Sequence, residues 1–167
     1  MPVSISEAEI NNYAKDGALL IKNLLTPEEV LDLREGIEVN ISHPSPRAKV
    51  ASKEREPGWF FEDFCNWQVN PAYRRIIFES AISEVAAKLM RSEQVRLFHD
   101  HMLVKKKGTK QTTPWHHDQP YYNIEGMQNI SFWIPVDPVP LEWTLELVAG
   151  SHHGQWYMPR TFLKKDS

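Results

Sequence analysis

The spacing of apolar residues changes from a helical period to a strand-like one near residue 93, and this change strongly limits how the chain can fold. In the first half, apolar residues recur every three or four positions, as in helices that cover a sheet. From 95 to 104 two sets of side chains alternate, and 130–136 and 144–148 are further expected strands. Helices followed by antiparallel strands predict an α+β fold.

The expected helices begin at recognisable N-terminal signals. A capping-box pattern precedes a helix over 7–15, and a proline at the first helical position begins two more helices, at Pro27 and Pro71. Their N-cap residues are Ser6, Thr26 and Asn70. The short apolar run 18–21 is expected to be a strand between the first two helices.

Length and charge exclude several classes of protein. A chain of 167 residues is long enough for one hydrophobic core and short for two, so we expect a single domain over 1–167. The formal net charge of -3 gives no electrostatic basis for binding nucleic acid or an anionic membrane. One cysteine, no leader-like N-terminus and no long apolar run are typical of a cytoplasmic protein. The oligomeric state is left open.

Two neighbouring segments could surround a substrate. Residues 42–59 are rich in proline, lysine and glutamate and are expected to form a loop, either at a substrate entrance or as a plain surface excursion. The aromatic block from Trp59 to Trp67 follows this loop. Its large rings fit a pocket wall and a hydrophobic core equally well.

The segment 113–122 holds the side chains best suited to binding a metal ion. If the segment is extended, His116 and Asp118 point to one face and His117 points to the other. An imidazole and a carboxylate are two of the three ligands in the 2-His-1-carboxylate sites that hold non-haem Fe(II). The alternative is a strand histidine with satisfied hydrogen bonds that Asp118 orients, and the motif alone favours neither interpretation.

Four segments spread over almost the whole chain carry a family resemblance. They are Asp16–Leu24, the His116-x-Asp118 pair, Phe132–Pro135 and Leu145–His152. In this combination and order, the sequence resembles the phytanoyl-CoA dioxygenase family of Fe(II)- and 2-oxoglutarate-dependent oxygenases. The chain departs from the family pattern at 141–144, where Trp143 stands in a turn that is usually of Asn-Gly-Thr type.

The resemblance implies a double-stranded β-helix, the jelly roll of cupin-like proteins, with buttressing N-terminal helices. Family members continue well beyond the Gly-Ser-His segment that ends at His152. We therefore expect 1–167 to be an incomplete dioxygenase domain without the C-terminal strands of the jelly roll. In the family, the third iron ligand and the arginine that pairs with 2-oxoglutarate belong to that continuation.

The resemblance also implies roles for individual residues. It assigns Fe(II) ligation to His116 and Asp118, and it places Trp133 beside the cosubstrate 2-oxoglutarate. His101 and Lys105, on the expected inward face of their strand, are then neighbours of the 2-oxoglutarate carboxylates. His117 is expected to orient a metal ligand. The implied reaction is hydroxylation of an unactivated carbon of a small organic or acyl substrate.

Several alternatives stay open at this stage. The chain could be a catalytically silent fragment or a jelly-roll binding module that lacks the third iron ligand, or a zinc hydrolase with the same ligands. His152 could replace the third ligand, although a turn histidine that caps backbone groups is simpler. His99 and His101 could share a metal, although no glutamate follows at the cupin spacing. The lysines of 105–110 could attract an anionic substrate, although a solvated hairpin end is the simpler interpretation.

Overall fold

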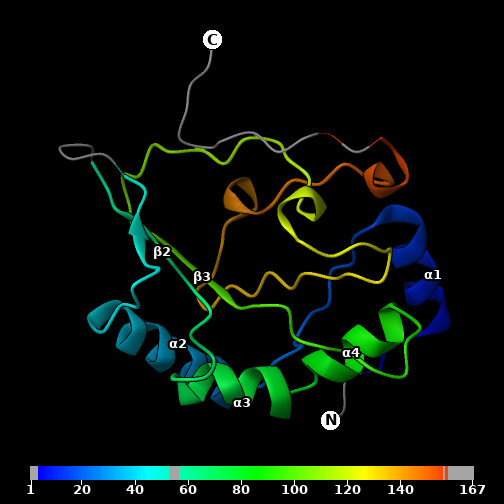
Figure 1. Cartoon of the computed structure of the whole chain (residues 1–167), viewed down its shortest axis with the longest axis horizontal. Coiled ribbons are helices and arrows are strands. Elements are labelled where there is room, and N and C mark those ends of the chain that lie inside the picture. Colours follow the sequence, from blue (N-terminus) through cyan, green and yellow to red (C-terminus); the bar gives the residue numbers. More distant parts are fainter. Residues whose placement is uncertain (1–3, 53–56, 156, 158–167) are drawn as a thin grey trace.

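The computed structural model describes residues 4–52, 57–155 and 157 (Figure 1). Its elements, in chain order, are α1 (Glu7–Asp16), α2 (Pro27–Ser42), β1 (Lys49–Val50), β2 (Phe60–Phe64), α3 (Pro71–Glu79), α4 (Ile82–Leu89), β3 (His101–Lys105) and the 3-10 helices η1 (Gln119–Tyr121), η2 (Leu141–Trp143) and η3 (Ser151–His153). Among these helices, none is long and apolar enough to span a membrane.

The three strands form one antiparallel sheet in the order β1-β2-β3. Phe61 of β2 and Met102 of β3 are buried in one cluster with Tyr73 of α3, and apolar residues of α2 pack against this cluster. The opposite face carries His101 and Lys105, which are exposed. Figure 1 shows α2 and α3 together along one side of the sheet. Helices packed on a small antiparallel sheet agree with the α+β expectation.

A second buried cluster lies where α1 packs against α4. Ile10 of α1 and Val85 and Leu89 of α4 form its centre. Ile130 and Phe132 pack against it from the second half of the chain. This cluster therefore joins the N-terminal helices to the segment that precedes Trp133.

The predicted helix starts are confirmed. All three expected N-cap side chains accept hydrogen bonds from backbone N–H groups, and the first two belong to complete capping boxes. Gly17 ends α1 in the left-handed conformation, with a φ of 78°. Local sequence is sufficient to specify these helix boundaries.

Several predicted strands are not formed in the described residues. Residues 18–21, 130–136 and 144–148 have no strand partner, and only the last part of 95–104 joins the sheet, as β3. Burial still alternates along 130–136, where Phe132 is half-buried and Trp133 is exposed. A strand needs a hydrogen-bonded neighbouring strand as well as alternating apolar and polar residues. The sequence of one segment shows the alternation but does not identify the neighbour. The jelly roll is accordingly not confirmed.

A buried carboxylate ties the sheet to α2. Asp63 of β2 is fully buried, and its oxygens accept hydrogen bonds from Asn40 Nδ2 at 2.8 Å, Ser45 N at 2.8 Å and Ser45 Oγ at 2.5 Å. Burial alone raises the pKa of Asp63, but the hydrogen bonds from Ser45, Asn40 and Asn66 outweigh it and lower the pKa to about 2. Asp63 is therefore a charged structural anchor at neutral pH.

Candidate metal centre

His116 and Asp118 are brought together by a turn. The expected strand is not formed here, and Asp118 has helical backbone angles (φ -71°, ψ -41°) immediately before η1. His116 Nε2 lies 3.1 Å from Asp118 Oδ1. The two side chains are 30% and 54% exposed, so an ion from solution can reach both. The predicted pair therefore converges, although through local turn geometry.

The ring of His116 is also fixed from its other nitrogen. Nδ1 lies 2.8 Å from the backbone oxygen of Pro114. A carbonyl oxygen only accepts hydrogen bonds, so Nδ1 carries the hydrogen in this contact. Nε2 faces Asp118, and once it has lost its own hydrogen its lone pair can bind a metal ion. A histidine that donates from one ring nitrogen to a backbone carbonyl is typical of metal-binding imidazoles.

Tyr122 connects this turn to the residues that precede β3. Its ring centroid lies 5.7 Å from that of His99 and 5.0 Å from that of Phe98, and its hydroxyl is 3.4 Å from Ser131 Oγ. Burial raises the pKa of Tyr122, the hydrogen bond with Ser131 lowers it, and the charge of Asp118 raises it. The carboxylate of Asp118 is therefore close enough to act on the phenol.

The exposed face of the sheet holds two of the other predicted site residues. His101 Nε2 lies 3.3 Å from Glu62 Oε2, and the His101 ring stacks on Phe64 with centroids 3.9 Å apart. Lys105 Nζ lies 4.6 Å from the centroid of the Phe60 ring and donates to the Gln111 backbone oxygen at 3.2 Å. The structure thus places both side chains on one surface.

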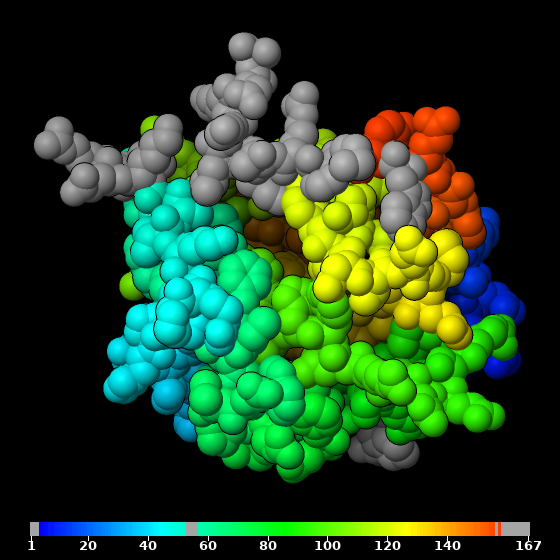
Figure 2. All heavy atoms as spheres, in the orientation of Figure 1, coloured from blue at the N-terminus to red at the C-terminus, as the bar shows by residue number. Residues whose placement is uncertain are grey.

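The face of the molecule between the sheet and the His116 turn is hollowed. Figure 2 shows the recess between the cyan atoms near β2 and the yellow atoms of the segment around η1, with orange atoms of a later segment deeper inside. Trp133, the third residue expected near the cosubstrate, is 45% exposed. A recess bordered by both regions is a suitable place for a small substrate.

A sequence model of the family described as Phytanoyl-CoA dioxygenase (PhyH) matches residues 13–166. The chain belongs to the phytanoyl-CoA dioxygenase family. The comparisons with curated proteins and with solved structures gave no match. At the level of this family, membership implies an oxygenase that depends on Fe(II) and 2-oxoglutarate.

The donor atoms of His116 and Asp118 fit Fe(II) in their chemistry. An imidazole nitrogen and a carboxylate oxygen that converge on one point are a suitable donor pair for this ion, and the carbonyl of Pro114 orients the ring. Among the residues that the structure describes, no three His, Cys, Asp or Glu side chains form a metal-binding group. The described residues therefore bring together two candidate ligands, His116 and Asp118.

His152 contacts the backbone at the end of α1, as expected for a turn histidine that caps backbone groups. Its Nε2 lies 3.0 Å from the Ala14 backbone oxygen in the last turn of α1, and its Nδ1 is buried against Gly17 without a hydrogen-bond partner. The N–H of Gly150 donates to the Asp16 oxygen at 2.8 Å. Two family segments, at 16–24 and 145–152, thus bind each other, and His152 serves as a turn histidine that caps the helix.

Glu62 is the residue that the sequence analysis missed. It lies inside the aromatic block, in a strand with alternating faces. Phe60, Glu62 and Phe64 share one sheet face, whereas Phe61 and Asp63 share the other. The period-2 pattern of β2 was the signal that could have located it.

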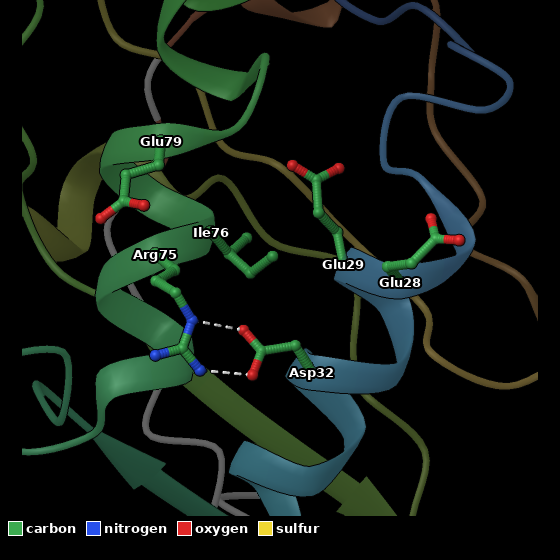
Figure 3. A pocket seen from close by; sticks show the side chains of 6 residues that line it. All are labelled: Glu28, Glu29, Asp32, Arg75, Ile76 and Glu79. Carbon is green, nitrogen blue, oxygen red and sulfur yellow. Dashed lines mark hydrogen bonds and ion pairs between the residues drawn. The ribbon is translucent and has the colours of Figure 1, made fainter.

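The pocket between α2 and α3 is a separate, acidic site (Figure 3). Asp32 and Arg75 pair across it, with Arg75 Nε donating to Asp32 Oδ2 at 2.8 Å. Glu29 is already engaged, because its carboxylate accepts from the Thr26 N–H in the α2 capping box. The charged pair of Asp32 and Arg75 therefore stabilises the packing of α2 against α3.

Proposed function

We propose that this protein is a 2-oxoglutarate-dependent hydroxylase that acts on an unactivated carbon of a small organic or acyl substrate. The observation that carries the proposal is the pair of donor atoms His116 Nε2 and Asp118 Oδ1, 3.1 Å apart, in a member of the phytanoyl-CoA dioxygenase family. When bound, Fe(II) with 2-oxoglutarate supplies the oxidation: one atom of O2 enters the substrate, the other enters succinate, and CO2 leaves.

In this proposal the chain's own residues hold and orient the reactants. His116 and Asp118 would provide two metal ligands, and the contact of His116 with Pro114 holds the imidazole in an orientation that would direct Nε2 toward a bound ion. His117, whose ring lies 5.5 Å from that of Tyr157, is proposed to support this turn from its other side.

Lys105 is proposed to hold a carboxylate of 2-oxoglutarate. Burial lowers the pKa of Lys105, because part of its side chain lies against apolar neighbours such as Phe60. A partly desolvated ammonium gains from an anionic partner. Trp133 is proposed to form a wall beside the cosubstrate. The single cysteine is in keeping with action in a reducing compartment, and we propose the cytoplasm.

Succinate formation tests the proposal. Purified protein is incubated with Fe(II), 2-oxoglutarate, ascorbate and air, and succinate is measured with each component omitted in turn. We expect succinate only when Fe(II), 2-oxoglutarate and O2 are all present. Absence of succinate together with absence of 2-oxoglutarate binding would contradict the proposal and favour a catalytically silent binding module.

A further inference from the structure

The exposed face of the sheet has two chemically different ends. Phe64 is paired with His101 at one end, and Phe60 is paired with Lys105 at the other. Glu62 lies between the two phenylalanines on the same face, because alternate strand residues point to the same side. Four residue steps separate His101 from Lys105, which is about 13 Å along a strand.

The His101 ring is held in one orientation by two contacts. It stacks on Phe64 with an interplanar angle of 22°, and its Nε2 faces the Glu62 carboxylate at 3.3 Å. The side chains of His101 and Glu62 are only 32% and 21% exposed. A carboxylate accepts hydrogen bonds, so Nε2 carries the hydrogen in this pair.

The charge state of His101 follows from its surroundings. Burial lowers the pKa of His101, the charge and hydrogen bond of Glu62 raise it, nearby His99 lowers it and Asp100 raises it, with a net shift downward. The downward shift favours the neutral ring at pH 7. A neutral ring whose Nε2 carries the hydrogen has Nδ1 as a hydrogen-bond acceptor.

An acceptor beside a carboxylate is a poor site for an anion. Lys105, at the far end of the face, presents a cation, whereas His101 presents a lone pair next to the negative charge of Glu62. A dicarboxylate such as 2-oxoglutarate is attracted to Lys105 and repelled from the pair of His101 and Glu62. The two ends therefore suit different molecules.

A series of neighbouring aromatic rings extends from the His101 end of the face toward His116 and Asp118. The His101 and His99 centroids are 6.5 Å apart, and those of His99 and Tyr122 are 5.7 Å apart. The charge of Asp118 in turn raises the pKa of Tyr122. A molecule that contacts His101 is thus on the side of the sheet that leads to His116 and Asp118.

We propose that His101, held by Glu62 and Phe64, selects the substrate by accepting a hydrogen bond at Nδ1 from a hydroxyl or ammonium group, while 2-oxoglutarate is held at the Lys105 end. This inference rests on the proposed function and names the chemical class of its substrate: a compound with a hydroxyl or ammonium group that donates a hydrogen bond to His101. Glu62 is a positioning residue that sets the tautomer of His101.

The first test is the tautomer of His101, read from long-range 1H–15N NMR spectra of the full chain with 15N-labelled histidine. We expect Nε2 to be protonated and Nδ1 to be unprotonated at pH 7. Glu62→Leu should shift the population toward the Nδ1–H tautomer, whereas Lys49→Met, on the same sheet face, should leave it unchanged. A protonated Nδ1 in the native chain would overturn the proposal.

The second test compares hexanol, hexylamine and hexanoate, which share an alkyl chain and differ in the head group. We expect hexanol or hexylamine to shift the Nδ1 resonance of His101, and hexanoate to leave it in place. A shift by hexanoate alone, or by none of the three, would overturn the proposal. Neither test needs iron or turnover. Absence of both succinate and 2-oxoglutarate binding would therefore reject the proposed function without deciding the state of His101.

Discussion

The described residues up to 105 (4–52 and 57–105) and residues 106–155 are built in different ways. The first region contains all the α-helices and strands of the described chain and both buried clusters, whereas the second contains only 3-10 helices and irregular backbone. Long-range tethers such as the bonds of Arg34 to Val136 and of His152 to Ala14 attach the second region to the first. Packing therefore stabilises the first region, and in the second the pair of His116 and Asp118 is shaped by its own turn.

Because the two regions are built differently, we expect that stability and the proposed activity can be changed separately. Substitutions in the turn around η1 should change activity and leave the free energy of unfolding almost unchanged. Substitutions of Asp63 or its hydrogen-bond partners should lower the free energy of unfolding and leave the activity of the folded protein almost unchanged.

The largest effect is expected from Asp118→Ala. Removing one of two donor atoms from an exposed turn should lower succinate formation by more than about a hundredfold, because loss of an outer contact alone costs about 10- to 100-fold. Urea unfolding should be unchanged within about 0.5 kcal/mol. Glu125→Ala, which removes another exposed carboxylate from the same region, is the matched control. Full activity in the Asp118 variant would refute the ligand assignment.

The opposite behaviour is expected from Asp63→Ala. The substitution leaves donors on Asn40 and Ser45 unpaired inside the protein, so the free energy of unfolding should fall by about 3 kcal/mol. Urea denaturation measures this change, and Glu38→Ala on the exposed side of α2 is the control. A loss below about 1 kcal/mol would show that the anchor is dispensable.

The same carboxylate predicts how stability depends on acid. The pKa of Asp63 is about 2 in the folded protein, below the ordinary value of 3.8, so the folded state favours the charged form. Its contribution, about 2 kcal/mol, is complete above the unfolded pKa and is lost as the pH falls from about 5 toward 2. Asp63→Asn should flatten this part of the stability profile relative to the native chain. An unchanged slope would assign the acid sensitivity to other groups.

A smaller effect is expected where the two regions meet at Gly17. A Cβ at this position would lie 2.4 Å from His152 Nδ1, and the φ of 78° is unfavourable for alanine. Gly17→Ala should therefore destabilise the chain by about 2 kcal/mol. In the Gly17→Ala/His152→Ala double variant the clash is absent, so the combined loss should be smaller than the sum of the single losses. Strict additivity would place the two residues out of contact.

The smallest effect is expected from Arg34→Ala. Arg34 donates to the Val136 oxygen at 2.6 Å and pairs with Asp137 at 2.9 Å, but both charged side chains are largely exposed. The loss in the free energy of unfolding should be about 0.5 kcal/mol and should decrease in high salt. A loss above about 2 kcal/mol would mean that this tether, and not the α1–α4 cluster, holds the second region in place.

The same division explains what the sequence could predict. Helix starts depend on residues three positions apart, so the caps of α1, α2 and α3 followed from local sequence. The strand expected over 130–136 did not form, because pairing depends on a distant partner that alternation does not identify. The family could be recognised from segments in order along the chain, and the match over 13–166 confirms it.

The candidate site was predictable only in part, for a similar reason. His116 and Asp118 are two residues apart and meet through a local turn, so their pairing needs no knowledge of the fold. The contact of His101 with Glu62 joins residues 39 positions apart, and only the register of β2 against β3 creates it. The roles proposed for Lys105, Trp133 and His117 remain predictions, because each concerns contact with a bound cosubstrate or with the ligand of a metal ion.

Binding of a divalent metal tests the central claim most directly. Co(II), which takes the same donor atoms as Fe(II) and absorbs visible light when bound, is titrated without air into the native chain, Asp118→Ala and Glu125→Ala, each with 2-oxoglutarate present. The account predicts one saturable site in the native chain and in Glu125→Ala, with at least about tenfold weaker binding in Asp118→Ala. Equal binding by all three proteins, or by none, would contradict a metal centre built on His116 and Asp118.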